Sequence, residues 1–143
     1  MSLERRDFLK QACGLCASLV GIAAVLPALS ACSPLKTITS EVNQGTIDVA
    51  VSNFTADNNL VIIRNESFDF DLALVKYPAG NYKAFQLQCT HRPSPLVATK
   101  TGFFCNVHGS RFSIDGKVTQ SPATTDLKEY NVQVSTDKIT IKI

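Results

Sequence analysis

The chain has 143 residues, with 14 Lys and Arg against 12 Asp and Glu, which gives a formal net charge of +2. This length suits one domain, and so small a net charge gives no electrostatic case for nucleic-acid binding. With only two histidines in the sequence, a catalytic apparatus that needs three or more of them is excluded.

The first 31 residues have the pattern of an export leader. Arg5-Arg6 is followed by Phe8-Leu9-Lys10, and residues 12–31 carry no charge. This opening resembles a twin-arginine signal, a class that addresses folded proteins to the far side of the membrane. The apolar stretch ends in Leu29-Ser30-Ala31-Cys32, which resembles a bacterial lipoprotein processing site. That resemblance implies that Cys32 is lipidated and becomes the mature N-terminus.

An uncleaved transmembrane anchor is the other interpretation of this segment. A helix needs about 20 apolar residues to span a bilayer, and this run is marginal and contains Pro27. Both interpretations place the domain outside the cytoplasmic membrane but attached to a membrane. If Cys32 is lipidated, the domain is attached either to the outer side of the cytoplasmic membrane or to an outer membrane. Cys13 and Cys16 have C-x-x-C spacing, but they lie in the leader and receive no redox role.

After an expected tether over residues 32–41, residues 42–143 form the expected domain, in which apolar and polar residues alternate with a period of two. Strands are predicted at residues 47–51, 60–63, 72–77, 82–88, 130–134 and 139–143. Turn signals separate them at residues 53–59, 78–81, 115–116 and 136–138. No long helical pattern follows residue 32. The sequence therefore predicts an all-β fold, an antiparallel β-sandwich or small barrel.

Two short motifs carry four candidate metal ligands. Cys89-Thr90-His91 directly follows a predicted strand, and Cys105-Asn106-Val107-His108 follows the apolar piece Gly102-Phe103-Phe104. Each motif pairs one thiolate with one imidazole. Zinc accepts two Cys and two His, but its usual spacing groups Cys with Cys and His with His. A [2Fe–2S] cluster of the Rieske type takes two Cys on one iron and two His on the other. We favour the cluster, and zinc and coincidence remain as alternatives.

Residues 82–143 resemble the Rieske [2Fe–2S] family. The similarity covers the two motifs, the continuation Gly109-Ser110-Arg111-Phe112, Asp115-Gly116, a Pro122 segment and the closing strands. It implies a Rieske-like fold with a cluster-binding subdomain of two hairpin loops, and one cluster per chain. Carried over by position, Cys89 and Cys105 would bind the inner iron, and His91 and His108 the outer iron.

The resemblance also assigns roles around the ligands. Ser110 matches a serine whose hydroxyl donates to a bridging sulfide, and Phe112 stands where high-potential members have a tyrosine that donates to a cysteine sulfur. Such hydrogen bonds raise the reduction potential. Respiratory members also have a disulfide between the two loops, and the corresponding positions here are Ser94 and Val107. We therefore expect a potential below that of the respiratory proteins.

The ligand assignment limits the function. An oxygenase needs a second iron held by two His and a carboxylate, and both histidines are already used. The chain is expected to be a membrane-tethered, exported electron carrier or the small subunit of an exported oxidase. A redox protein would dock at the face formed by His91 and His108. The alternatives are a Rieske subunit of a quinol-oxidising cytochrome complex and a structural zinc-binding lipoprotein domain.

Overall fold

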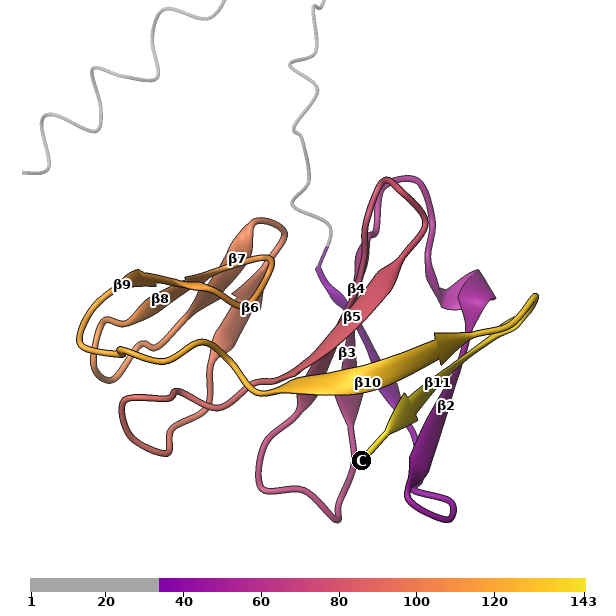
Figure 1. The fold of residues 1–143 in the computed structure, drawn as a ribbon, viewed down its shortest axis with the longest axis horizontal. Helices are drawn as coiled ribbons and strands as arrows, with labels where there is room; N and C mark the ends of the chain where they lie inside the picture. Colours follow the sequence, from indigo (N-terminus) through magenta and orange to yellow (C-terminus); the bar gives the residue numbers. More distant parts are fainter. Residues whose placement is uncertain (1–33) are drawn as a thin grey trace, which may run out of the picture. The chain divides into compact units, whose positions relative to one another are not determined.

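Two β-sheets make up residues 34–143, the part of the chain that the computed structural model describes (Figure 1). The larger sheet has seven strands in the order β1-β3-β4-β5-β10-β11-β2. These are β1 Lys36–Thr39, β2 Thr46–Ala50, β3 Leu60–Arg64, β4 Leu72–Lys76, β5 Tyr82–Gln86, β10 Glu129–Val134 and β11 Lys138–Lys142. All neighbouring pairs are antiparallel except β1 with β3, which is parallel.

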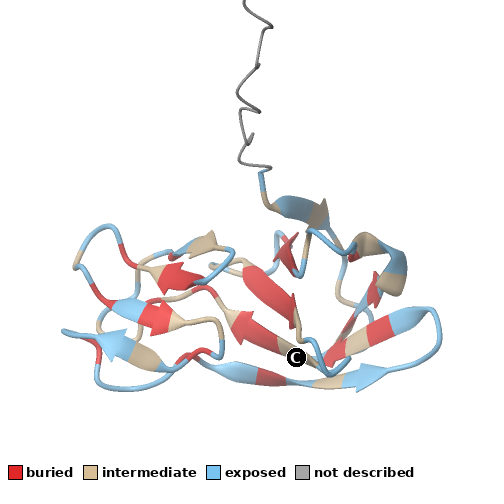
Figure 2. Cartoon of the chain, turned by 90° about the horizontal axis from the view of Figure 1, so that it is seen from above, coloured by how far each residue is buried: buried red, intermediate tan, exposed pale blue. Residues whose placement is uncertain are grey.

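The middle of the larger sheet is buried on both faces. In β3 and β4 four consecutive residues are buried, with the sequences Leu-Val-Ile-Ile and Leu-Ala-Leu-Val. Successive side chains of a strand point to opposite faces, so such runs require cover on both sides. Val61 and Leu74 pack with the inner side chains of β2 and β11, whereas Leu60 and Val75 pack into a second core that includes the smaller sheet. Figure 2 shows the buried residues along these strands.

The smaller sheet lies between β5 and β10 in the sequence. It contains β6 Val97–Thr99, β7 Gly102–Phe104, β8 Arg111–Ser113 and β9 Val118–Gln120, joined in that order by antiparallel pairing. Phe103 and Phe112 are paired across β7 and β8, and both are buried in the second core. The Phe103 ring packs edge to face against the Phe85 ring, and the two ring centroids are 6.1 Å apart. One core therefore joins the smaller sheet to the larger one.

The six predicted strands are confirmed as β2, β3, β4, β5, β10 and β11, and the fold is all-β as predicted. The only helix among residues 34–143 is the 3-10 turn η1 Val51–Asn53, and no helix there could cross a membrane. The structure differs from the expected tether at residues 36–39, which form β1. Ile38 packs against the core of the larger sheet, and this contact favours a strand over a free linker. Arg5, Arg6 and Cys32 lie outside the described residues.

Candidate metal centre

The two predicted motifs lie in two loops that meet. The first loop follows β5, and the second connects β7 to β8. Cys89 and Cys105 are buried, with 2% and 1% of their surfaces exposed, whereas His91 and His108 are half-buried. The sulfur atoms therefore lie inside the protein and the imidazoles at its edge.

The ligand atoms of Cys89, Cys105 and His108 all lie within 4.8 Å of one another. The Nδ1 atom of His108 is 3.5 Å from the Cys105 sulfur. His91 is not part of this group of three, but its ring lies beside the His108 ring, with centroids 4.9 Å apart and planes at 80°. The structure thus brings all four predicted residues to one place.

Backbone hydrogen bonds close each loop around its cysteine. The Cys89 N–H donates to the carbonyl oxygen of Ser94 at 2.9 Å, and the Cys105 N–H donates to that of Ser110 at 2.9 Å. Gly109 follows His108 with a φ of +83°, a conformation that side chains of L-residues rarely adopt. Its N–H donates back to the Cys105 carbonyl at 3.0 Å. These bonds hold each Cys and His pair on a tight turn.

The environment of Cys89 favours a thiolate. Burial acts to raise the pKa of this thiol, but hydrogen bonds outweigh burial and the pKa is lowered below its ordinary value. The donors are the backbone N–H groups of His91 and Arg92 and the side chains of Cys105 and Ser110. A thiolate is the form of cysteine that binds metals.

The chemistry of these donors fits a [2Fe–2S] cluster of the Rieske type. The Nδ1 atom of His91 is buried and has no hydrogen-bond partner among the described residues. A buried polar atom without a partner is unfavourable unless a ligand satisfies it, and an imidazole nitrogen is a metal donor. Together with two cysteines that form no disulfide, it completes the set of two sulfurs and two nitrogens.

Ser110 and Phe112 flank the ligands. Ser110 is fully buried, its oxygen accepts a hydrogen bond from the Ala123 N–H at 3.0 Å, and its hydroxyl donates to the Cys89 sulfur. Phe112 is 2% exposed and packs in the core that contains Cys89 and Cys105. Ser94 and Val107 stand in the two loops, and Val107 is 62% exposed.

A third loop, residues 121–128, braces the site, and its contacts were not predicted. The Thr90 hydroxyl donates to the Thr125 carbonyl at 2.6 Å, which ties the first ligand loop to this segment. Ala123 ties the second ligand loop through Ser110, as described above. The Pro122 segment was part of the family resemblance, but no sequence signal indicated these partners.

Known proteins with related sequences bear on the identity of the chain. Residues 39–131 match the Rieske [2Fe-2S] domain family. The cytochrome b6-f complex iron-sulfur subunit of Chlorobaculum thiosulfatiphilum is 24% identical over 143 residues, with 99% of this chain and 76% of that subunit covered. The subunit of the same name from Chlorobaculum tepidum is 25% identical over 153 residues, with 100% and 77% covered.

Solved structures share the fold. The crystal structure of the cyanobacterial plasma membrane Rieske protein PetC3 from Synechocystis PCC 6803 has a TM-score of 0.56 and 27% identity, and the match covers 66% of this chain and 95% of that one. The complex of reduced oxygenase and oxidized ferredoxin in carbazole 1,9a-dioxygenase has a TM-score of 0.53 at 21% identity, with 70% and 94% covered, a likeness of fold alone. By its sequence match, its fold and its two paired Cys and His motifs, the chain belongs to the Rieske [2Fe-2S] domain family.

Proposed function

We propose that this protein is an exported, membrane-tethered electron carrier, or the small subunit of an exported oxidase. A Rieske cluster, when bound, takes up and releases one electron. The observation that carries the proposal is the meeting of two Cys-and-His loops, with three ligand atoms within 4.8 Å and the fourth ligand, His91, beside them. Cys89 and Cys105 would hold the inner iron of the cluster, and His91 and His108 the outer one.

The cysteines and the histidines of the site have different roles. The two cysteines are buried and keep the sulfur side of the site away from water. The Nδ1 atom of each imidazole lies on the inner side, which leaves the Nε2–H groups of His91 and His108 on the outer side of their rings. These groups are placed to meet a redox partner and to exchange protons with it.

Metal content and redox spectroscopy test this proposal. Purified protein should be brown, contain two irons per chain and give the EPR signal of a reduced Rieske cluster. Cys105→Ser should lose the iron, because it removes a buried thiolate ligand, whereas Ser94→Ala should retain it. A colourless protein that contains one zinc per chain would overturn the proposal in favour of the structural zinc site.

The exported, tethered state is supported by the leader motif and by the similarity to a protein whose name describes it as a plasma membrane Rieske protein. Cys32→Ser should release the protein from the membrane fraction, and replacing Arg5 and Arg6 by Lys should retain it in the cytoplasm. A Cys32→Ser variant that stays in the membrane fraction would favour the uncleaved anchor.

A quinol-oxidising cytochrome complex is the second candidate, because two related sequences are subunits of a b6-f complex. Against it stand Phe112, the absence of a second cysteine at Ser94 and Val107, and the lipoprotein-type leader. Co-purification with a b-type cytochrome would favour this second candidate. Co-purification with a large molybdenum enzyme would favour the oxidase subunit.

A further inference from the structure

Positive charge is concentrated in the part of the chain that holds the metal centre. Residues 87–128, which lie between β5 and β10, contain five Lys and Arg against two Asp and Glu, a formal charge of +3. The remaining residues of 34–143 contain six against eight, a formal charge of −2. The protein is therefore electrostatically polarised, with its positive part around the ligand loops.

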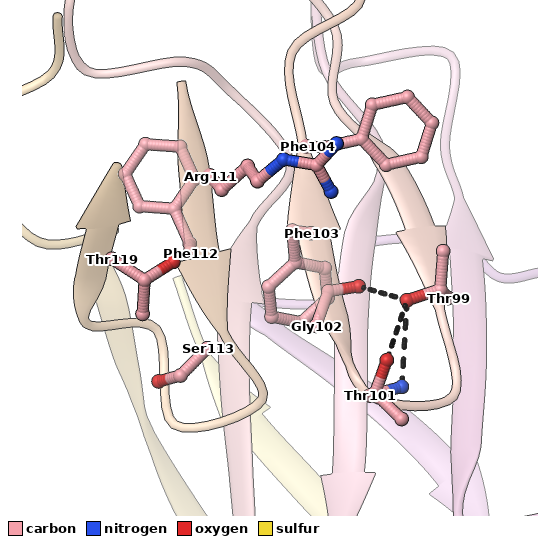
Figure 3. A pocket seen from close by; sticks show the side chains of 9 residues that line it. All are labelled: Thr99, Thr101, Gly102, Phe103, Phe104, Arg111, Phe112, Ser113 and Thr119. Atoms are coloured by element: carbon pink, nitrogen blue, oxygen red, sulfur yellow. Dashed lines mark hydrogen bonds between the residues drawn. The ribbon is translucent and has the colours of Figure 1, made fainter. Parts of the chain in front are cut away.

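Arg111 is a cation of this region that is placed to bind a carboxylate. It begins β8 directly after Ser110, and it takes part in none of the ion pairs found among residues 34–143. Its guanidinium carbon lies 5.8 Å from the centre of the Phe104 ring, which is its cross-strand partner (Figure 3). Stacking on an aromatic ring orders a guanidinium while leaving it able to bind a carboxylate.

A hollow of about 450 Å³ opens beside this pair on the outer face of the smaller sheet. Gly102 lies in it and contributes no side chain, and the lining includes the hydroxyl groups of Thr99, Thr101 and Thr119 (Figure 3). Arg111 is the only charged residue of the lining. A second groove, of about 380 Å³, adjoins His91 and is lined by Arg92 and Lys128 together with Asp126. The first hollow differs in that its lining holds a positive charge and no negative one.

The same face has the composition of a protein interface. Val97 is 40% exposed and is the cross-strand partner of Phe104 on β6. Phe104 itself is half-buried. An arginine beside aromatic and aliphatic side chains is typical of the centre of protein interfaces. Cys105 directly follows Phe104, and its N–H binds the carbonyl of the residue that precedes Arg111. A protein docked here would contact Phe104, which directly precedes the candidate ligand Cys105, and Arg111, which lies three residues after the candidate ligand His108.

We propose that the outer face of the smaller sheet, centred on Arg111 and Phe104, docks the acidic face of a redox protein, with a carboxylate of that protein paired to Arg111. This inference rests on the proposed electron-transfer function and specifies the chemistry of the partner. The positive charge around the ligand loops would steer an acidic protein toward the metal centre, and salt would weaken the attraction.

Two probes test the surface in the full-length holoprotein. The first is a fluorescein-labelled hexaglutamate peptide, whose binding is measured by fluorescence anisotropy at low and high salt and requires no electron transfer. The second is ferricyanide, a trianion that takes one electron from the reduced protein to form ferrocyanide, followed by stopped-flow absorbance. Arg111→Gln should weaken peptide binding and slow oxidation by about two- to fivefold at low salt. High salt should remove most of this difference.

Matched variants make the result specific to this face. Lys142→Gln removes an exposed positive charge from β11 in the larger sheet, and it should change both measurements little. Thr119→Glu adds a negative charge to the lining and should act in the same direction as Arg111→Gln.

The proposal is overturned if the wild-type protein does not bind the peptide, or if Arg111→Gln has no more effect than Lys142→Gln. It is also overturned if Arg92→Gln, beside His91, has a larger effect than Arg111→Gln, because the acidic ligand would then bind in the groove beside His91. Absence of iron from the purified protein would instead refute the electron-transfer function, and the peptide measurement does not depend on iron.

Discussion

The cysteines and histidines of the site differ in their surroundings, and this difference suits their roles. Each cysteine N–H is bound within its own loop, and both sulfurs are buried. The imidazoles lie at the edge, where the Nδ1 atom of His91 has no protein partner among the described residues. A cluster held by these residues would have its cysteine sulfurs shielded from water and its imidazoles at the edge of the protein.

Phe112 is expected to keep the reduction potential low, because a phenyl ring donates no hydrogen bond to sulfur. Phe112→Tyr should raise the midpoint potential by about 60 mV, the one-electron equivalent of about 1.4 kcal/mol. The measurement is a redox titration followed by visible circular dichroism. Phe104→Tyr is the control, because this ring lies beside Arg111 on the outer face of the same sheet and its midpoint should not change. An unchanged or lower midpoint in Phe112→Tyr would contradict the assigned role.

The four candidate ligand residues could be singled out from the sequence because each Cys and His pair is local, separated by two or three positions. The hydrogen bonds that tie the two ligand loops to the third loop could not be predicted. Thr90 binds the carbonyl of a residue 35 positions away, and Ser110 binds an N–H 13 positions away. Contacts at such separations depend on how the third loop folds back, and no local pattern encodes that path.

At the scale of elements, strands with a clear alternation or a continuous apolar run could be predicted, whereas the three-residue strands could not. β6, β8 and β9 have three residues each, which is too short for a period of two to show. β1 was not predicted, and its residues fell in the expected tether, because only Ile38 among them contacts the core. The turn predicted at residues 115–116 is confirmed between β8 and β9, where Gly116 has a φ of +74° and its N–H binds the Ser113 carbonyl.

Any side chain at Gly116 is predicted to destabilise the fold. A Cβ atom there would lie 2.6 Å from Cε1 of Phe85, whereas at Gly80, with a φ of +83°, it would meet nothing within 4 Å. Both Gly80→Ala and Gly116→Ala incur the strain of a positive φ, but only the second must displace a buried ring. Gly116→Ala should therefore lower the free energy of unfolding by about 1–3 kcal/mol more than Gly80→Ala. Urea denaturation measures both, and equal losses would contradict the packing described.

At the scale of the whole described domain, the two sheets are joined by a shared core and by a hydrogen bond between residues 37 positions apart in the sequence. The Tyr77 hydroxyl, just after β4, donates to the Ile114 carbonyl, just after β8, at 3.1 Å. Burial raises the pKa of Tyr77 well above its ordinary value, and the nearby Asp115 carboxylate adds to the shift. The neutral phenol is thus the form that the folded protein favours.

This shift predicts a loss of stability in alkali. A tyrosine whose pKa is raised by folding contributes fully below its unfolded pKa of about 10, and the contribution is lost as pH rises toward the folded value. The urea midpoint of the wild-type protein should fall more steeply between about pH 9 and 11 than that of Tyr77→Phe. Tyr77→Phe should be less stable at neutral pH, because its hydrogen bond is missing. Parallel curves for the two proteins would show that Tyr77 is not responsible.

The most direct test of the whole account uses the fact that the chain has only two histidines. The full-length protein is produced with ¹⁵N-labelled histidine, reduced, and examined by electron–nuclear double resonance on its EPR signal. The account predicts strong couplings from two distinct histidine nitrogens, assigned by the loss of one when either His91 or His108 is replaced. An iron-containing protein that shows coupling to one histidine nitrogen, or to none, would contradict the assignment of all four ligands to a single cluster.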